Sequence, residues 1–326
     1  MALCGKANIT NMIPIFPRFR EISIADRAEF SAAIAEHPPG ISELTFTNLY
    51  VWRHFYQPRL SRLDDFILVR VRMKGHDSFL APIGPGLSLL PYEAAAGLLA
   101  SEGHAPFFER IPQPHADLLL SCKDRYTISP DRDNFDYLYL REELALLPGR
   151  RFMDKRNHAH QFERKYHYDF TKLSAEHLPG CLALLNTWCE LRHCAEDMGL
   201  SGEERAIQEA IGHFEELAVT GGAILLNGQV QAFSLGEPLS ADTVVIHFEK
   251  GNSEIPGIYQ AINRDFCRIA WAGFQFINRE QDLGVPGLRR AKESYNPVRL
   301  VPKYQVRVNI PSSSDQSCKL DLEPVR

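Results

Sequence analysis

Two periodicities of hydrophobic residues alternate along the first half of the chain. Residues 66–72 alternate with period two, which predicts a strand with one apolar face. Residues 24–36 instead carry apolar residues at helical spacing, and a Pro-Pro-Gly run at 38–40 ends that helix. The same patterns predict helices or helical turns over 44–55, 92–100 and 114–122, and strands over 78–83, 107–111 and 135–140. Alternating strands and helices are typical of a layered α/β protein.

The second half repeats this alternation after a Leu-Pro-Gly-Arg-Arg junction at 147–151. Its clearest local signal is Asn227-Gly228 between two apolar runs, which predicts a hairpin. The patterns predict strands over 167–171, 223–226, 230–236, 243–250, 274–277 and 301–308, and helices over 155–165, 178–194, 203–219, 256–271 and 285–295. Strand 243–250 should pair in parallel with strand 274–277, because a helix connects them.

Several motifs carry a resemblance to a known family. They are residues 42–50 with Trp52, Arg156 and Asn157 with Phe162, residues 247–260, 277–284 and 287–292, and Tyr295, Lys303 and Tyr304. With these motifs the chain resembles, over residues 20–308, a bacterial domain family of unknown function related to the C-terminal catalytic domain of phosphatidylglycerol lysyltransferases. The resemblance implies an α/β (α+β) fold with two tandem GNAT-like (acyl-CoA N-acyltransferase-like) domains and mixed sheets. Such relatives move an amino acid from aminoacyl-tRNA to an amine or hydroxyl. In the GNAT topology that the resemblance implies, strands 243–250 and 274–277 part at their carboxyl ends and leave a gap that admits an acyl group.

This interpretation divides the chain into four parts. We expect an N-terminal arm over residues 1–20, a degenerate GNAT-like domain over 21–148, a second GNAT-like domain with the main site over 149–310, and a flexible tail over 311–326. Residues 1–20 lack the apolar stretch and cleavage site of a secretion signal. No apolar run reaches the length that a transmembrane helix needs.

Composition narrows the class of protein. The chain has 326 residues, of which 44% are hydrophobic and 24% charged, values that exclude disordered and collagen-like chains. Its net charge of −5 argues against a globally cationic nucleic-acid binder, although a local basic patch remains open. Seven irregularly spaced cysteines favour reduced thiols, so we expect a cytoplasmic protein.

The segment from strand 243–250 into the next helix is the main candidate site. Lys250, Gly251, Asn252, Ser253, Gly257 and Tyr259 surround the start of a helix, where free amides suit an anion. In GNAT enzymes the corresponding loop holds the pyrophosphate of coenzyme A. Here Glu254 lies inside the loop and would repel it. An ordinary strand-to-helix turn explains the same residues.

Candidate catalytic groups flank that segment. Glu249 lies two residues from His247, so both should share a strand face, and partial burial would suit Glu249 as the general base. Glu280 and Asp282 could hold a substrate ammonium. By resemblance Tyr295 would protonate the leaving hydroxyl, and Lys292 should lie near the same helix face. Asn278 would line the ligand crevice beyond its strand. The alternatives are a polar strand face, a charged loop and a solvated helix.

A local basic helix could bind polyanions. Arg151, Lys155, Arg156 and Asn157 could contact the phosphates of tRNA or of a phospholipid head group, or could form only a solvated face. No metal site is predicted: Cys189 and His193 stand four apart, with Cys181 and Cys194 nearby, but paired Cys-x-x-Cys spacing is missing.

The predicted activity is transfer of an aminoacyl group, with aminoacyl-tRNA as donor, to an amine or hydroxyl acceptor. The acceptor would be a small molecule, a peptide or a lipid head group. A coenzyme-A-dependent N-acetyltransferase and a non-catalytic GNAT-like binding module are the alternatives. The sequence leaves the donor, the acceptor and the oligomeric state open.

Overall fold

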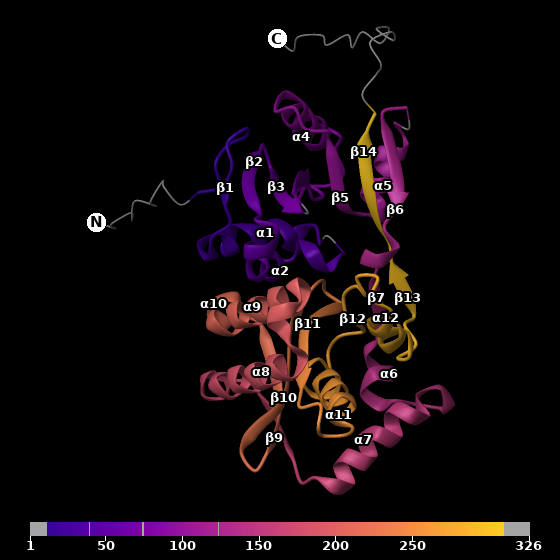
Figure 1. Cartoon of the computed structure of the whole chain (residues 1–326). Coiled ribbons are helices and arrows are strands. Elements are labelled where there is room, and N and C mark those ends of the chain that lie inside the picture. The colour runs from indigo at the N-terminus through magenta and orange to yellow at the C-terminus, as the bar shows by residue number, and fades with distance from the viewer. Residues whose placement is uncertain (1–11, 39, 74, 123, 310–326) are drawn as a thin grey trace, which may run out of the picture.

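The computed structural model describes residues 12–38, 40–73, 75–122 and 124–309 as two seven-stranded mixed sheets with helices on their faces (Figure 1). Residues 1–11 of the predicted arm and the predicted tail over 311–326 lie outside the described residues. The first sheet has the order β1-β2-β3-β4-β5-β14-β6, with strands Arg20–Glu21, Arg59–Leu63, Phe66–Met73, His76–Phe79, Phe107–Pro112, Lys303–Val308 and Tyr126–Pro130. The second has the order β13-β7-β12-β11-β10-β9-β8, with strands Arg299–Val301, Asp136–Leu140, Phe276–Asn278, Thr243–Gly251, Gln229–Pro238, Thr220–Leu226 and Asp169–Lys172.

Most helices match a predicted range, but the helix Arg141–Leu146 was not predicted, and the one predicted over 203–219 is two helices, Met198–Gly212 and Phe214–Leu217. Those of the first half are α1 Arg27–Glu36, α2 Phe46–Val51, α3 Arg53–Tyr56, α4 Leu90–Ser101, α5 Gln113–Leu120 and α6 Arg141–Leu146. Those of the second half are α7 Met153–Lys165, α8 Leu178–Arg192, α9 Met198–Gly212, α10 Phe214–Leu217, α11 Ile258–Asp265 and α12 Pro286–Glu293. In the described part of the chain, none of these helices has both the length and the apolar character needed to cross a bilayer.

Each half of the chain contributes one strand to the sheet of the other half. β7 precedes residue 148 yet lies between β13 and β12 of the second sheet, and β14 belongs to the first sheet between β5 and β6. The single strand predicted over 301–308 is therefore two strands, β13 and β14, which pair in different sheets on either side of Pro302. Sheet membership thus does not follow the predicted division after residue 148, and the two halves are physically interlocked.

The parallel pairing predicted for the second half is confirmed. Thr243, Val244 and Val245 of β11 pair with residues 276–278 of β12, and α11 connects the two strands. The predicted helix over 256–271 ends as a π-helical turn, Phe266–Ala270, after α11. The Asn227-Gly228 hairpin is also present, with positive φ at both residues, as a type I′ turn requires.

A β-bulge interrupts β11 at His247. Leu235 pairs with Phe248 and Gly236 pairs with Ile246, so His247 is an extra residue on this strand. Ile246 packs with Phe266 in one core cluster, whereas Phe248 belongs to the cluster that includes Cys181 of α8. The regular alternation that predicts a shared face for His247 and Glu249 is therefore broken.

Candidate active site at the splayed strands

The carboxyl ends of β11 and β12 part after three paired residues. Beyond Val245 and Asn278 the backbones no longer pair, and side chains cross the gap instead. His247 Nδ1 lies 2.8 Å from Glu280 Oε1. Arg279 Nη2 lies 3.1 Å from Glu249 Oε1. Two ion pairs therefore span the predicted gap, one after the other.

His247 is held between two carboxylates. Its Nε2 lies 3.0 Å from Glu237 Oε1, and its ring is 2% exposed. Burial disfavours the charged imidazolium, but the hydrogen bonds to Glu237 and Glu280 outweigh burial and raise the pKa of His247 to about 10. Helix α2 of the first half contributes to this group, since Thr47 donates to Glu237 and Asn48 donates to Glu280. The bulge thus turns His247 toward the junction of the halves.

Glu249 has different neighbours. Its carboxylate accepts from Arg279 and, at 3.1 Å, from the amide of buried Asn263 on α11. The Arg279 guanidinium lies over the Tyr295 ring at 4.9 Å, so Glu249 and Tyr295 share Arg279 as a neighbour. Asn263 Oδ1 is buried without a hydrogen-bond partner in the described residues.

Two ammonium groups border the same cluster. Lys292 donates to the backbone carbonyl of Arg279, and burial followed by repulsion from Arg279 lowers its pKa to about 8. Lys155 of α7 lies over the Tyr295 ring at 4.6 Å, and burial lowers its pKa. Burial also raises the pKa of Tyr295, which favours the protonated phenol that an acid needs.

Glu280 and Asp282, predicted to hold one ammonium together, have separate partners. Burial raises the pKa of Glu280 although its hydrogen bond with His247 opposes the shift. Asp282 is buried and accepts from Arg289, from the Tyr137 hydroxyl at 2.6 Å and from the Gly284 amide. Its oxygens are therefore occupied by the chain itself, and Asp282 anchors α12. Asn278 is likewise internal, because it donates to Asp136 and accepts from the Glu280 amide.

A buried ionic network joins the halves beside this gap. Lys303 Nζ, which is fully buried, lies 2.5 Å from Glu43 Oε2 and 2.6 Å from Asp136 Oδ1. Arg110 Nη1 lies 2.5 Å from the other Glu43 oxygen, and these partners lower the pKa of Glu43 to about 2 despite burial. The sequence predicted no function for these residues. The motif over 42–50 and Lys303 contributed only to the resemblance to the family.

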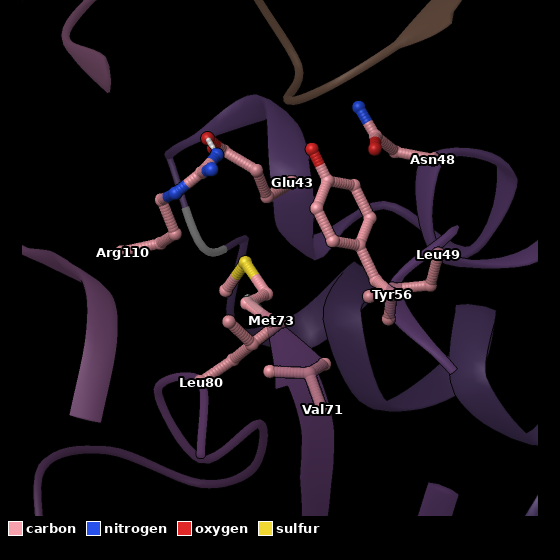
Figure 2. A pocket seen from close by; sticks show the side chains of 8 residues that line it. All are labelled: Glu43, Asn48, Leu49, Tyr56, Val71, Met73, Leu80 and Arg110. Carbon is pink, nitrogen blue, oxygen red and sulfur yellow. Dashed lines mark hydrogen bonds and ion pairs between the residues drawn. The ribbon is translucent and has the colours of Figure 1, made fainter. Parts of the chain in front are cut away.

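A small cavity adjoins the network on the side of the first half (Figure 2). It is lined by Glu43, Asn48, Leu49, Tyr56, Val71, Met73, Leu80 and Arg110. The Tyr56 hydroxyl points toward its polar end in Figure 2, opposite Val71 and Leu80. Its volume of about 20 Å³ suits a single water or one small group. Arg110 has a positive φ, and its Nε is buried without a partner in the described residues.

The predicted anion loop is already satisfied by its own chain. The amides of Glu254 and Ile255 bond to Asn252, and the Ile258 amide bonds to the Ile255 carbonyl. A Cβ at Gly257 would lie 2.3 Å from the carbonyl oxygen of His158, so α7 covers the start of α11. The loop therefore presents few free amides to a pyrophosphate and fits coenzyme A poorly.

Other residues of this predicted anion site are also engaged. Lys250 is buried, pairs with Glu203 at 2.9 Å and lies 3.6 Å above the Trp188 ring. Tyr259 donates to the Gly251 carbonyl and accepts from Trp188. Asn252 also donates to Gln231, and the side chain of Ser253 is exposed.

The basic helix is α7, and its predicted phosphate ligands differ in freedom. Arg156 donates to the Leu147 and Gly149 carbonyls and so holds the junction between the halves. Arg151 pairs with Glu143 and is half exposed. Asn157 is exposed, and Lys155 is half-buried beside Tyr295. Only part of this surface is therefore open to a polyanion.

Comparisons with known proteins identify a family model and solved structures that are similar to this chain. The family model for the C-terminal region of phosphatidylglycerol lysyltransferase matches residues 35–307. A conserved protein of unknown function from Bacteroides thetaiotaomicron VPI-5482 is 33% identical, with a TM-score of 0.84 over 91% of this chain and 100% of that chain. No curated protein matches the chain.

Two synthetase structures share the fold at low identity. L-PGS from Bacillus licheniformis has 16% identity and a TM-score of 0.63, over 88% of this chain and 93% of that chain. The C-terminal domain of a putative lysylphosphatidylglycerol synthetase from Agrobacterium fabrum has 12% identity and a TM-score of 0.62, over 88% and 92%. The predicted fold, two tandem GNAT-like domains with mixed sheets, is confirmed. The matching family model supports an aminoacyl-transferase-like activity. The chain belongs to the family of phosphatidylglycerol lysyltransferase C-terminal domains.

Proposed function

We propose that this protein transfers an aminoacyl group from aminoacyl-tRNA to an amine or hydroxyl acceptor, in the gap between β11 and β12. The observation that carries the proposal is the pair of ionic contacts across this gap, His247–Glu280 and Glu249–Arg279. They bring carboxylates, a guanidinium and a phenol together in a protein of this family. Positioning, one base and polar donors are what acyl transfer from an ester requires.

Glu249 serves as the general base in this proposal. The acceptor nitrogen or oxygen attacks the ester carbonyl, Glu249 takes its proton, and the ribose hydroxyl leaves. Tyr295 supplies the proton to that leaving oxygen, directly or through one water. Arg279 lies between the two and can donate to the developing oxyanion once the substrate displaces Glu249 from it. Glu280 and His247 orient the far side of the gap.

The coenzyme A alternative has less support. Its pyrophosphate would need free amides at the start of α11, but Asn252 and α7 occupy that turn. An aminoacyl ester on tRNA needs no such cradle. Lys155 and the exposed part of α7 lie where phosphates of an acceptor stem could approach Tyr295.

A transfer assay tests the donor and the base. Purified protein would be incubated with tRNA charged with labelled amino acids, together with phosphatidylglycerol vesicles or hydroxylamine as acceptor. We expect label to move from tRNA to at least one acceptor, and acetyl-coenzyme A to support no comparable transfer. Glu249→Gln should lower turnover by about 10²–10⁴, because general-base steps contribute that much.

Glu176→Gln is the matched control, since that carboxylate is 79% exposed and remote from the gap. It should leave the rate unchanged, and circular dichroism should show that both variants are folded. Full activity of Glu249→Gln would refute Glu249 as the base. Transfer from acetyl-coenzyme A but from no charged tRNA would refute the proposed donor.

A further inference from the structure

Two cysteines and a glutamate converge where α8 turns into α9. Cys189 lies in the last turn of α8, Cys194 in the short turn that follows, and Glu204 on α9. Their sulfur and carboxylate atoms all lie within 4.8 Å of one another. Both thiols are buried and the carboxylate is half-buried. Figure 1 shows α8 and α9 side by side. Sequence spacing pointed instead to His193, but this residue caps α8 with a left-handed backbone and is exposed.

The charge balance of this cluster favours a cation. Glu204 faces the two thiols, and in the part of the chain that the structure describes it has no ion-pair partner. A divalent cation would compensate the carboxylate and would replace the thiol protons.

We propose that Cys189, Cys194 and Glu204 bind one zinc ion. Thiolate and carboxylate are both zinc ligands, whereas magnesium and calcium prefer an all-oxygen set. Three protein ligands leave the fourth tetrahedral position to a water, which the half-exposed Glu204 side of the cluster can admit. Binding replaces two S–H protons by two Zn–S bonds, and the protons go to solvent.

The site would stabilise the surroundings of Lys250 on β11 without taking part in the reaction. Trp188 and Glu203, which hold Lys250, immediately precede Cys189 and Glu204 in the chain. A metal that joins α8 to α9 would therefore keep these Lys250 partners in place. It is independent of the aminoacyl-transfer proposal, because none of its ligands borders the gap between β11 and β12.

Metal analysis of the whole protein tests the proposal. Protein purified under reducing conditions would be loaded with zinc chloride, dialysed and measured by inductively coupled plasma mass spectrometry. We expect about one zinc per chain and the release of about two protons per zinc at neutral pH. Affinity should rise with pH, because the thiols must lose their protons. Chelation should lower the thermal midpoint, and zinc should restore it.

Variants separate this site from the other thiols. Cys194→Ser and Glu204→Gln should weaken zinc binding more than the 10–100-fold, roughly, that outer-shell substitutions cost. Cys122→Ser, on another element, should bind like the parent protein. If a cysteine variant fails to fold, Glu204→Gln still decides, since its side chain is only half-buried. Three results would overturn the proposal. They are the absence of stoichiometric zinc, a Cys189–Cys194 disulfide in the reduced preparation, and zinc binding by the Glu204→Gln and Cys194→Ser variants that equals binding by the parent protein.

Discussion

At the scale of single residues, three buried basic side chains lie where the halves meet. Lys303, Arg110 and His247 are all buried, and each one touches a carboxylate at hydrogen-bond distance. Removing one partner of such a buried pair usually destabilises a protein strongly, because the other charge stays buried and unpaired. The network therefore favours one arrangement of the two halves. It also orients the carboxylates of Glu43 and Asp136 beside the candidate site.

His247 gives a pH-dependent prediction at this scale. Its folded pKa of about 10 lies above the ordinary 6.5, so its contribution to stability is complete below about pH 6.5 and disappears as the pH rises toward 10. His247→Gln keeps a polar side chain but removes this titration. Urea unfolding of both proteins at several pH values should show that their stability difference shrinks from about pH 6.5 to about pH 10.

His54→Gln provides the control for His247, because this imidazole also pairs with a glutamate of the other half, Glu209, but is half-exposed. Its stability difference from the parent protein should stay small over the same range, because exposed ion pairs contribute little to stability. A His247→Gln difference that stays constant up to about pH 10 would show that the imidazolium is not held between its two carboxylates.

At the scale of elements, close packing of α7 on α11 explains why Gly257 begins that helix. Its φ is +86°, and a β-carbon at this position would approach the His158 carbonyl oxygen to 2.3 Å, which leaves no room for a larger residue. The sequence indicated an anion-binding loop there, because a glycine before a helix looks the same whether a phosphate or a neighbouring helix lies against it. Only the tertiary structure distinguishes the two.

Gly257→Ala should therefore destabilise the protein markedly. Left-handed strain and overpacking each cost about 1–3 kcal/mol, so we expect a loss of at least about 2 kcal/mol in the free energy of unfolding. Denaturant titration measures it. Gly212→Ala at the end of α9 is the control, because its new side chain would meet open space. Equal stability of the two variants would contradict the proposed packing of α7.

Local sequence patterns predicted most helices and strands. They failed where contacts between residues distant in the sequence determine the structure. The period-two strand at 66–72 and the Asn227-Gly228 turn are correct because backbone preference and burial agree there. The shared face of His247 and Glu249 is wrong because a bulge adds one residue to β11. Strand β2 escaped prediction, since its Arg-Leu-Ser-Arg-Leu sequence is short and weakly apolar. The partners of Glu43, Arg110 and Lys303, are distant from it in the sequence, so no local pattern predicts these contacts.

At the scale of the whole molecule, each half contributes one strand to the sheet of the other half. β14 separates β5 from β6 in the first sheet, and β7 separates β13 from β12 in the second. Each half therefore needs a strand from the other to complete its hydrogen-bonded ladder. Lys303, the first residue of β14, adds a buried ionic contact with Glu43 of the first half and Asp136 of β7.

Fragments divided at the predicted boundary should consequently fail to fold alone. Fragment 21–148 would lack β14 and leave the edges of β5 and β6 unpaired, whereas 149–310 would lack β7 and uncover β12. Unpaired strand edges favour aggregation over a native state. We expect neither fragment to show a cooperative thermal transition, and the whole chain to show a single one. Co-expression of the fragments, which supplies both strands in trans, should recover soluble complex. Cooperative unfolding of fragment 149–310 by itself would show that β7 is dispensable and that the second sheet folds independently.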